Sequence, residues 1–314
     1  MKLGIDMGGM SIKMGLVNEE NKIIGRITIP TDLTVPYQTL VERMADAVRQ
    51  MLENAGMTLE QCGGIGIGSP GTIDAKQGVI LYSNNFGWEN VPIVEELKKH
   101  LDTRIEIAND ADAAALGEVC AGAAEGAENA VLLTLGTGVG SGVILDKKIF
   151  RGAMPGGCEL GHLSIRYDGI RCTCGRKGCL EAYASASALL RIAREKAAEH
   201  PESIMNEMCG NDLEQMNGKI PFDAAKAGDE AGMETVKEYE GYLACGIANV
   251  INTFRPEKVI LGGGVAAQRE NLTAPLKGLV KDMCFGGSHG YIADIVTSVL
   301  GNDAGIIGAA NLVV

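Results

Sequence analysis

Four side chains that could bind one metal ion lie in a single eighteen-residue segment: His162, Cys172, Cys174 and Cys179. Three thiolates and one imidazole complete a tetrahedral zinc site, and a site without an open position is structural rather than catalytic. The alternative is a set of free thiols beside a core histidine, which the C-x-C-x4-C spacing disfavours where cysteines are kept reduced. The other six cysteines are scattered singly, as is typical of small buried hydrophobic residues.

Two carboxylates flank this segment. Glu159 precedes His162 by three residues, and Glu181 follows Cys179 by two. A bound zinc ion would draw both carboxylates onto one rigid loop. Carboxylates and amides that converge on a pocket suit a polyhydroxylated ligand, because each hydroxyl donates to a carboxylate and accepts from an amide. Without the zinc, two solvated glutamates are the simpler interpretation.

A second polar pair, Asn109 and Asp110, lies where a predicted strand meets a predicted helix, a position whose side chains face a cleft. The carboxylate of Asp110 has two possible roles there. It can act on a ligand, or it can serve a purely structural purpose as the N-cap of the helix. Its position alone favours the cap.

Two glycine-rich turns could bind phosphate groups. Residues 6–11 and 136–142 each contain a turn after an apolar strand, and such a turn presents several backbone N–H groups to one anion. Lys13 adds a positive charge, and Asp6 is suited to holding a water molecule of a Mg²⁺ ion. Each turn alone is equally consistent with a hairpin that binds nothing, but two similar turns favour a nucleotide held between two halves.

The elements that must position these residues follow from the hydrophobic pattern. Alternation predicts three antiparallel strands in the first thirty residues, and a helix begins at Pro36 and stops at Gly56. The pattern of residues 3–17 returns at 133–145, which indicates a weak internal repeat of strand, glycine turn and strand. Further strands are predicted at 65–69, 104–108 and 258–261, and further helices at 92–101, 110–124, 185–198, 234–254 and 303–312, the last capped by Asn302 or Asp303.

Length, charge and composition limit the classes of protein to which this chain can belong. The chain has 314 residues, more than one hydrophobic core usually serves, so two domains are expected. Its net charge of −12 argues against a nucleic-acid partner or an anionic membrane surface. A secretory signal and an apolar run of about 18 residues are both absent, which predicts a soluble cytoplasmic protein. The 43 glycines exceed the average share, and we expect them where backbone approaches a ligand.

Six motifs carry a resemblance to a known family. They are Asp6-x-Gly-Gly, Ser69-Pro-Gly-Thr-Ile-Asp74, the stretch from Asn109 to Glu118, Leu135-Gly-Thr-Gly-Val-Gly-Ser-Gly142, Glu159-Leu-Gly-His162 and Cys172-x-Cys-Gly-x-x-Gly-Cys-x-Glu181. Together they closely resemble the ROK family of sugar kinases and sugar-responsive repressors. The cysteine block with its preceding Glu-x-Gly-His segment is highly specific, and the glycine turns are less so. The resemblance extends to residues 303–309 and covers essentially the whole chain.

The resemblance implies an α/β protein with the actin-like (ribonuclease H-like) ATPase fold, in which two domains have the active site in the cleft between them. The last helix is implied to return to the first domain, so the expected domains are residues 1–118 with 303–314, and residues 119–302 with a zinc-binding insertion. The implied activity is ATP-dependent phosphorylation of a hexose, glucose foremost. The implied cofactors are ATP, Mg²⁺ and structural Zn²⁺, and a homodimer is expected.

The resemblance also implies roles for single residues. Asp110 is implied as the general base that accepts the proton of the attacking sugar hydroxyl. The implied sugar-binding residues are Asn84, Asn109, Asp110, Glu159, His162 and Glu181. The residues expected at the phosphates and magnesium are Asp6, Gly8, Gly9, Ser11, Lys13, Thr137 and Gly138, and those expected under the adenosine are Gly262, Gly263 and Gly264.

Two positions depart from the family pattern. Met10 stands where the first turn usually has a threonine, which removes a hydroxyl near the phosphates and is expected to affect ATP affinity or rate. Ser11 could replace that hydroxyl in part. Asp112 stands in place of an asparagine, and we expect it to cap the helix rather than to raise the pKa of Asp110.

Three alternatives to a glucose kinase stay open at this point. The sugar could instead be N-acetylmannosamine, fructose or allose. A sugar-sensing regulator is disfavoured, because the family's repressors carry an N-terminal helix-turn-helix domain and the first strand here begins at residue 2 or 3. A non-catalytic sugar-binding protein has Met10 as its only support.

Overall fold

Three β-sheets and ten α-helices make up the part of the chain that the structure, a computed structural model, describes: residues 1–290 and 292–313. The strands are β1 (Lys2–Met7), β2 (Ser11–Val17), β3 (Ile23–Pro30), β4 (Ile65–Ser69), β5 (Thr72–Asp74), β6 (Val79–Ser83), β7 (Trp88–Val91), β8 (Ile105–Asn109), β9 (Ala130–Leu135), β10 (Val139–Leu145), β11 (Lys148–Ile149), β12 (Lys258–Gly262) and β13 (Asp294–Thr297). The helices are α1 (Tyr37–Asn54), α2 (Ile93–Lys98), α3 (Asp110–Ala121), α4 (Glu181–Ala184), α5 (Ala186–Glu199), α6 (Ile204–Met208), α7 (Ile220–Lys226), α8 (Glu230–Phe254), α9 (Glu270–Met283) and α10 (Asp303–Ala310). Each strand and helix predicted from the hydrophobic pattern is present.

The chain divides into two compact units. Unit 1 consists of Met1–Leu132, Gly142–Cys158 and Val299–Val314, and unit 2 consists of Leu133–Ser141 and Glu159–Ser298. The domains expected from the sequence differ by assigning residues 119–132, 142–158 and 299–302 to the second domain. Those domain limits stay a prediction, and Val314, which they include, lies outside the described residues.

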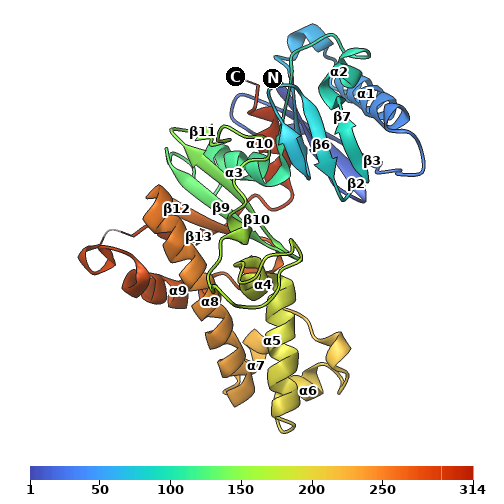
Figure 1. The fold of residues 1–314 in the computed structure, drawn as a ribbon. Coiled ribbons are helices and arrows are strands. Elements are labelled where there is room, and N and C mark those ends of the chain that lie inside the picture. Colours follow the sequence, from blue (N-terminus) through green and yellow to red (C-terminus); the bar gives the residue numbers. More distant parts are fainter. Residues whose placement is uncertain (291, 314) are drawn as a thin grey trace. The chain divides into compact units, whose positions relative to one another are not determined.

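The first sheet of unit 1 brings two strand ends with polar residues to one edge. Its strand order is β3-β2-β1-β4-β8 (Figure 1). The first three strands pair antiparallel, as predicted, whereas β1, β4 and β8 run parallel. In this register Asp6 lies beside Gly68, and Gly68 lies beside Ala108. The carboxyl ends of β1 and β8 therefore deliver Asp6 and Asn109 to the same edge of the sheet.

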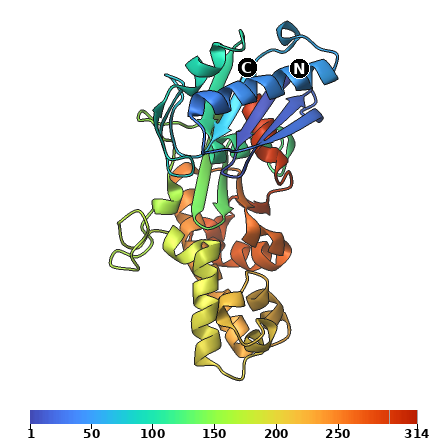
Figure 2. The ribbon, with the colours of Figure 1, turned by 90° about the vertical axis from the view of Figure 1, so that its right-hand side faces the viewer.

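Helices cover the two faces of this sheet in different ways. Figure 2 shows α1 lying across the strands, and its apolar stripe is buried in a core shared with Leu3 and Ile5. On the opposite face α10 packs backbone against backbone. A Cβ added at Gly4 or Gly66 would strike the backbone of α10, and one at Gly308 would strike the backbone of α3. Part of the glycine excess therefore serves close packing, a correction to our expectation that it marks ligand contacts.

The carboxylate of Glu118 fixes the segment that leads into α10. Glu118 is fully buried in α3. It accepts hydrogen bonds from the backbone N–H groups of Val299 at 3.1 Å, Leu300 at 3.0 Å and Ala123 at 2.7 Å. A buried charge of this kind is stable only when its oxygens are satisfied, as they are here. Glu118 thus ties the last segment of unit 1 to the helix that begins with Asp110.

The second sheet has the strand order β11-β10-β9-β12-β13, and a small third sheet in unit 1 has the order β5-β6-β7. In unit 2 the long helix α8 packs against α5, α7 and α9. Its buried positions include Tyr239, Leu243, Ile247 and Val250, which belong to the stripe that predicted this helix. No helix in the described part of the chain is long and apolar enough to cross a membrane.

The predicted caps of α3 are wrong, because Asn109, not Asp110 or Asp112, is its N-cap. For α10, Asn302 occupies the predicted N-cap position, but its backbone angles are helical and its side chain makes no capping hydrogen bond. Asp303, the other predicted cap, forms a bidentate ion pair with Arg26, with both N–O distances at 2.6 Å.

Candidate active site

In unit 1, the junction of β8 and α3 holds Asn109 in a fixed orientation. Its Oδ1 accepts hydrogen bonds from the backbone N–H groups of Ala111 at 2.8 Å and Asp112 at 3.4 Å. Its Nδ2 donates to the carbonyl oxygen of Gly71 at 3.1 Å. The side chain of Asn109 also forms a hydrogen bond with the carboxyl group of Asp110. The predicted sugar residue therefore has a structural task that sequence reasoning did not assign to it.

Asp110, the first residue of α3, is close enough to Asp6 for their charges to interact. Burial raises the pKa of the Asp110 carboxyl, although the N–H of Ala111, at 3.0 Å, donates to it and opposes the rise. Burial also raises the pKa of Asp6; Lys13, its partner across β1 and β2, opposes this and the charge of Asp110 adds to it. Two desolvated carboxylates beside one lysine are suited to handling protons and a cation-bound phosphate.

The first glycine turn, Gly8 to Ser11, is closed by its own backbone and by Thr31, the residue that follows β3. The N–H of Gly8 donates to the carbonyl of Ser11 at 3.0 Å. The N–H of Thr31 donates to the carbonyl of Met10 at 3.1 Å, and the Thr31 hydroxyl donates to the carbonyl of Gly8 at 2.6 Å. The side chain of Met10 is 91% exposed. Thr31 lies twenty residues further along the chain, so no local motif could have identified it.

Asn84, the remaining predicted residue of unit 1, lies in the loop between β6 and β7. Its side chain is exposed, and its Oδ1 accepts a hydrogen bond from the hydroxyl of Tyr82 at 3.4 Å. This contact orients the side chain of Asn84 less firmly than the hydrogen bonds of Asn109 orient its amide. Its sugar-binding role stays a prediction.

In unit 2, the four predicted metal ligands converge. One donor atom from each of His162, Cys172, Cys174 and Cys179 lies within 4.8 Å of all the others. The sulfurs of Cys174 and Cys179 are 3.6 Å apart, and the sulfur of Cys172 is 3.7 Å from Nδ1 of His162. Tetrahedral zinc with bonds of about 2.0–2.3 Å requires separations of this size. The residues therefore fit a closed zinc site.

The second glycine turn is held by the residues that follow the cysteine cluster. The N–H of Val139 donates to Oε2 of Glu181 at 3.1 Å, and a Cβ on Gly138 would collide with this carboxylate. Oε1 of Glu181 accepts from the hydroxyl of Thr173 at 3.1 Å and lies 3.3 Å from the sulfur of Cys172. Glu181 therefore joins the metal cluster to the turn of Thr137 and Gly138, a contact that sequence spacing did not indicate.

Two further parts of unit 2 match predicted positions. Glu159 is exposed just before a short 3-10 helix, Leu160–His162, which is tied down because the N–H of Leu160 donates to the hydroxyl of Ser141 at 2.9 Å. At the end of β12, a Cβ on Gly263 would strike the backbone of Leu135. Gly264 opens onto a cavity of about 520 Å³ with mixed polar and apolar walls. The cavity is lined by Ala186, Gly218, Lys219, Asp223, Lys226, Gly264, Val265, Ala267, Gln268 and Asn271.

Comparison with known proteins identifies the class. Structures that align with nearly the whole chain are sugar kinases with the two-domain, actin-like ATPase fold, which confirms the predicted fold class. The ROK family model matches residues 2–314, and the chain belongs to the ROK family.

Three relatives illustrate the similarity. The glucokinase of Thermotoga maritima is 37% identical over 312 residues, covering 99% of this chain and 96% of that protein. A ROK glucokinase from Streptomyces griseus, solved in complex with glucose and AMPPNP, is 32% identical with a TM-score of 0.78, over 99% of this chain and 98% of that one. A ROK hexokinase from Thermus thermophilus is 32% identical with a TM-score of 0.80, over 99% and 97%.

Proposed function

We propose that this protein is an ATP-dependent glucose kinase that transfers the terminal phosphoryl group of ATP to glucose and forms glucose 6-phosphate. Glucokinases with 32–37% identity over almost the full chain support this reaction, as does a relative solved with glucose and an ATP analogue. The observation that carries the chemistry is Asp110. It is a half-buried carboxylate at the carboxyl end of β8, and desolvation raises its pKa.

Asp110 acts as the general base. A carboxylate with a raised pKa holds a proton better than an ordinary aspartate, so it accepts the proton of the attacking hydroxyl as the bond to phosphorus forms. Asn109 caps α3 and is tied to Gly71, and it thereby fixes the direction of the neighbouring Asp110. General base catalysis of this kind contributes about 10²–10⁴-fold, and positioning and charge stabilisation supply the rest.

The two turns bind the phosphates of ATP. Backbone N–H groups at Gly9, Thr137 and Gly138 donate to phosphate oxygens, Lys13 contributes positive charge, and Gly8 closes the first turn through the hydrogen bond from its N–H to Ser11. Asp6, with Ser11 nearby, would hold Mg²⁺, which neutralises the charge on the phosphates when bound. The cavity beside Gly264 takes the adenosine, where Asp223 and Gln268 offer groups for the ribose and the base.

The metal cluster orients the sugar-binding set of unit 2. His162 and the three cysteines would hold structural Zn²⁺, and the ion would fix Glu159 and Glu181 at either end of one loop. Hydroxyls of glucose donate to these carboxylates, and Asn84 and Asn109 donate to the sugar oxygens. A homodimer and a cytoplasmic location stay predictions.

The decisive experiment combines one variant with a panel of sugars. Asp110→Asn keeps the shape of the side chain and removes its basicity, so ADP release with glucose should fall at least about 100-fold while calorimetry still detects glucose binding. Asp102→Asn, an exposed aspartate on the loop before β8, is the matched control and should behave as wild type. Substantial turnover by Asp110→Asn would show that another group is the base.

The panel and the pH profile complete this test. Glucose should be preferred over N-acetylmannosamine, fructose and allose. If none of the four sugars is phosphorylated, the proposal that this protein is a sugar kinase is overturned. Because the pKa of Asp110 is raised, its protonation should lower kcat on the acidic side at a pH above the value of about 4 typical of aspartate. In Asp110→Asn this limb of the profile should disappear.

A further inference from the structure

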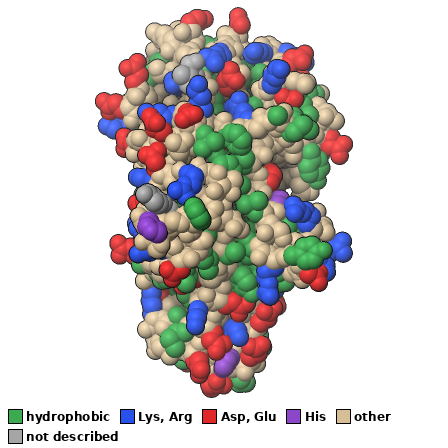
Figure 3. All heavy atoms as spheres, turned by 60° about the vertical axis from the view of Figure 1, so that its left-hand side comes forward, with side chains coloured by type: hydrophobic (Ala, Val, Ile, Leu, Met, Phe, Trp, Pro, Cys, Tyr) green, Lys and Arg blue, Asp and Glu red, His purple; other side chains and the backbone are tan. Residues whose placement is uncertain are grey.

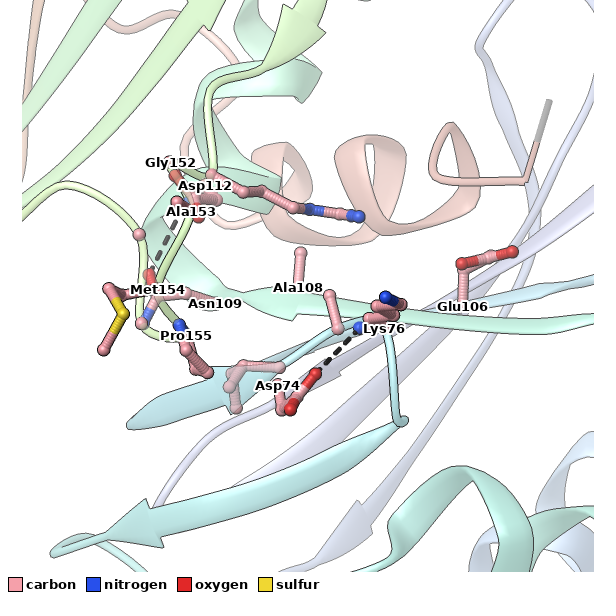
Figure 4. Close-up of a pocket in the computed structure, with 15 residues that line it drawn as sticks. Asp74, Lys76, Glu106, Ala108, Asn109, Asp112, Gly152, Ala153, Met154 and Pro155 are labelled. Carbon is pink, nitrogen blue, oxygen red and sulfur yellow. Dashed lines mark hydrogen bonds between the residues drawn. The ribbon is translucent and has the colours of Figure 1, made fainter.

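Unit 1 contains a cavity of about 530 Å³ that the proposed mechanism does not use (Figure 4). Small-molecule sites commonly measure about 300–1,000 Å³. Among the proposed sugar residues, only Asn109 lines it, and neither Asp110 nor any proposed phosphate ligand does. Its other lining residues are Ile73, Asp74, Ala75, Lys76, Glu106, Ala108, Asp112, Arg151, Gly152, Ala153, Met154, Pro155, Gly156 and Gly157.

The walls of this cavity are held in place by contacts within unit 1. Glu106 and Ala108 alternate along β8, so they share one face of the strand, and Figure 4 shows them leading toward Asn109 and Asp112. The loop 151–157 forms the opposite wall. It is anchored by the N–H of Gly156, which donates to the carbonyl of Ile73 at 3.2 Å. The cavity is therefore formed without a ligand.

Each acidic group in the wall has a different environment. Oδ1 of Asp74 accepts from the N–H groups of Lys76 at 3.1 Å and Gln77 at 3.0 Å. Glu106 pairs with the guanidinium of Arg104 at 3.2 Å. Asp112 is buried in the first turn of α3, where the helix dipole favours a negative charge, and its Oδ1 accepts no hydrogen bond from the described residues.

The two basic side chains in the wall are Lys76 and Arg151. Neither Lys76 nor Arg151 forms an ion pair with any residue in 1–290 or 292–313, although acidic residues outnumber basic ones in this chain by 40 to 28. Other basic side chains of unit 1, such as Arg26 and Arg43, have acidic partners. Lys76 and Arg151 therefore place two positive charges, without an ion-pair partner among the described residues, in the cavity wall. An anionic group such as phosphate would supply the missing partner.

We propose that this cavity binds a phosphorylated sugar and that its occupancy regulates the kinase. Lys76 and Arg151 bind the phosphate, and the wall carboxylates and the loop backbone bind the hydroxyls. The ligand would therefore contact both the basic and the acidic side chains of the cavity wall. The regulatory part rests on the proposed function. Its physical basis is that Asn109 also orients Asp110 and that the loop 151–157 continues into Cys158 and Glu159.

Two sources could supply such a ligand: the reaction itself, as glucose 6-phosphate, or another reaction that forms a hexose phosphate. Coupling between two sites is reciprocal, so a ligand that alters glucose binding must itself bind differently when glucose is present. Calorimetry on the full chain without ATP separates the sources, with glucose 6-phosphate, fructose 6-phosphate and inorganic phosphate as the injected compounds. Saturating glucose is present throughout, so that the proposed sugar site is occupied and the heat reports the second cavity alone.

We expect a hexose phosphate to bind under these conditions and inorganic phosphate to bind at least about tenfold more weakly. Lys76→Ala with Arg151→Ala should weaken hexose phosphate binding at least about tenfold and leave KM for glucose unchanged without the effector. Ala153→Trp, which fills the cavity and keeps both charges, should have the same effect. The control is Lys148→Ala with Arg43→Ala, two basic residues of unit 1 outside the cavity wall, and it should bind as wild type does.

In the steady state, inhibition by the hexose phosphate should persist at saturating glucose in wild type and vanish in both cavity variants. Loss of binding when glucose is saturating would overturn the proposal, because it would place the ligand in the sugar site. Equal binding by the double variant, or by inorganic phosphate, would also overturn it. A protein that binds hexose phosphate but never phosphorylates glucose would overturn the proposed function and the regulation, and leave the binding site standing.

Discussion

The two glycine turns look alike in the sequence but are supported differently in the structure. The first turn, Gly8 to Ser11, depends on its own backbone and on the neutral hydroxyl of Thr31. The second, Gly136 to Gly138, depends on the carboxylate of Glu181, and Glu181 also contacts the segment of Cys172 and Thr173. A hydrogen bond between neutral groups contributes about 0.5–1.5 kcal/mol, and one to a charged group about 1.5–3 kcal/mol. The second turn should therefore be far more sensitive to substitution, and to loss of metal, than the first.

Removing a metal ligand should have the largest effect. Cys179→Ser should lose the bound zinc and lower kcat/KM for both substrates about 100-fold or more, since losing an outer-shell partner already costs about 10–100-fold. Metal analysis and ADP-release kinetics on the same sample test this. Cys245→Ser, a cysteine of α8 outside the cluster, is the control. A zinc-free protein with full activity would contradict the link between the cluster and the second turn.

Changing the carboxylate of Glu181 should have the next largest effect. Glu181→Ala removes the acceptor for the N–H of Val139 and should reduce kcat/KM for ATP about 10- to 100-fold, as expected for a hydrogen bond to a charged group. Glu181→Gln keeps an oxygen acceptor and should retain more ATP affinity while glucose binding weakens. Equal ATP kinetics in both variants would show that Glu181 acts on the sugar alone.

Removing the support of the first turn should have a smaller effect. Thr31→Val deletes a hydroxyl of nearly the same volume and should raise KM for ATP about fivefold, the equivalent of one neutral hydrogen bond. KM for glucose should stay unchanged, and Thr31→Ser should restore the wild-type value. A fall in melting temperature without any change in KM for ATP would mean that Thr31 stabilises the strand rather than the phosphate turn.

The exposed residue of the first turn should matter least. Met10→Thr restores the family's usual hydroxyl at a side chain that is 91% exposed and makes no hydrogen bond of its own through that side chain. We expect KM for ATP to change by about twofold or less, within the range typical of surface substitutions. A tenfold fall in KM would show that the missing hydroxyl limits ATP binding in this chain.

Sequence patterns predicted those regular elements that have a strong local signal, and they missed β11, β13, α4, α6, α7 and α9. The stripe of Leu40, Val41, Met44 and Val48 defines α1, and alternation defines β1 to β3. The third sheet was missed, because β5 and β7 have only three and four residues and too little alternation to register. Spacing grouped the metal ligands correctly, since all four lie close in sequence.

The sequence did not predict contacts between residues that lie far apart along the chain. Thr31 at the first turn, Glu181 at Val139 and Glu118 at Val299 join residues that are 23, 42 and 181 positions apart. Only the fold brings such pairs together, and no local motif encodes them. The same applies to Lys76 and Arg151, whose shared cavity depends on the loop after β11 returning to β5. Figure 3 shows basic and acidic side chains interspersed on one face.

The packing of α10 also bears on how the protein is made. The strands β1 and β4 leave the ribosome long before α10, the helix that covers one of their faces, is synthesised. The glycine-lined face of β1 and β4 therefore stays uncovered while the roughly 230 residues between β4 and α10 are translated. A nascent chain halted before residue 299 would lack α10 and two of the backbone partners of Glu118, Val299 and Leu300. Such a chain is the form on which a chaperone would be expected to act.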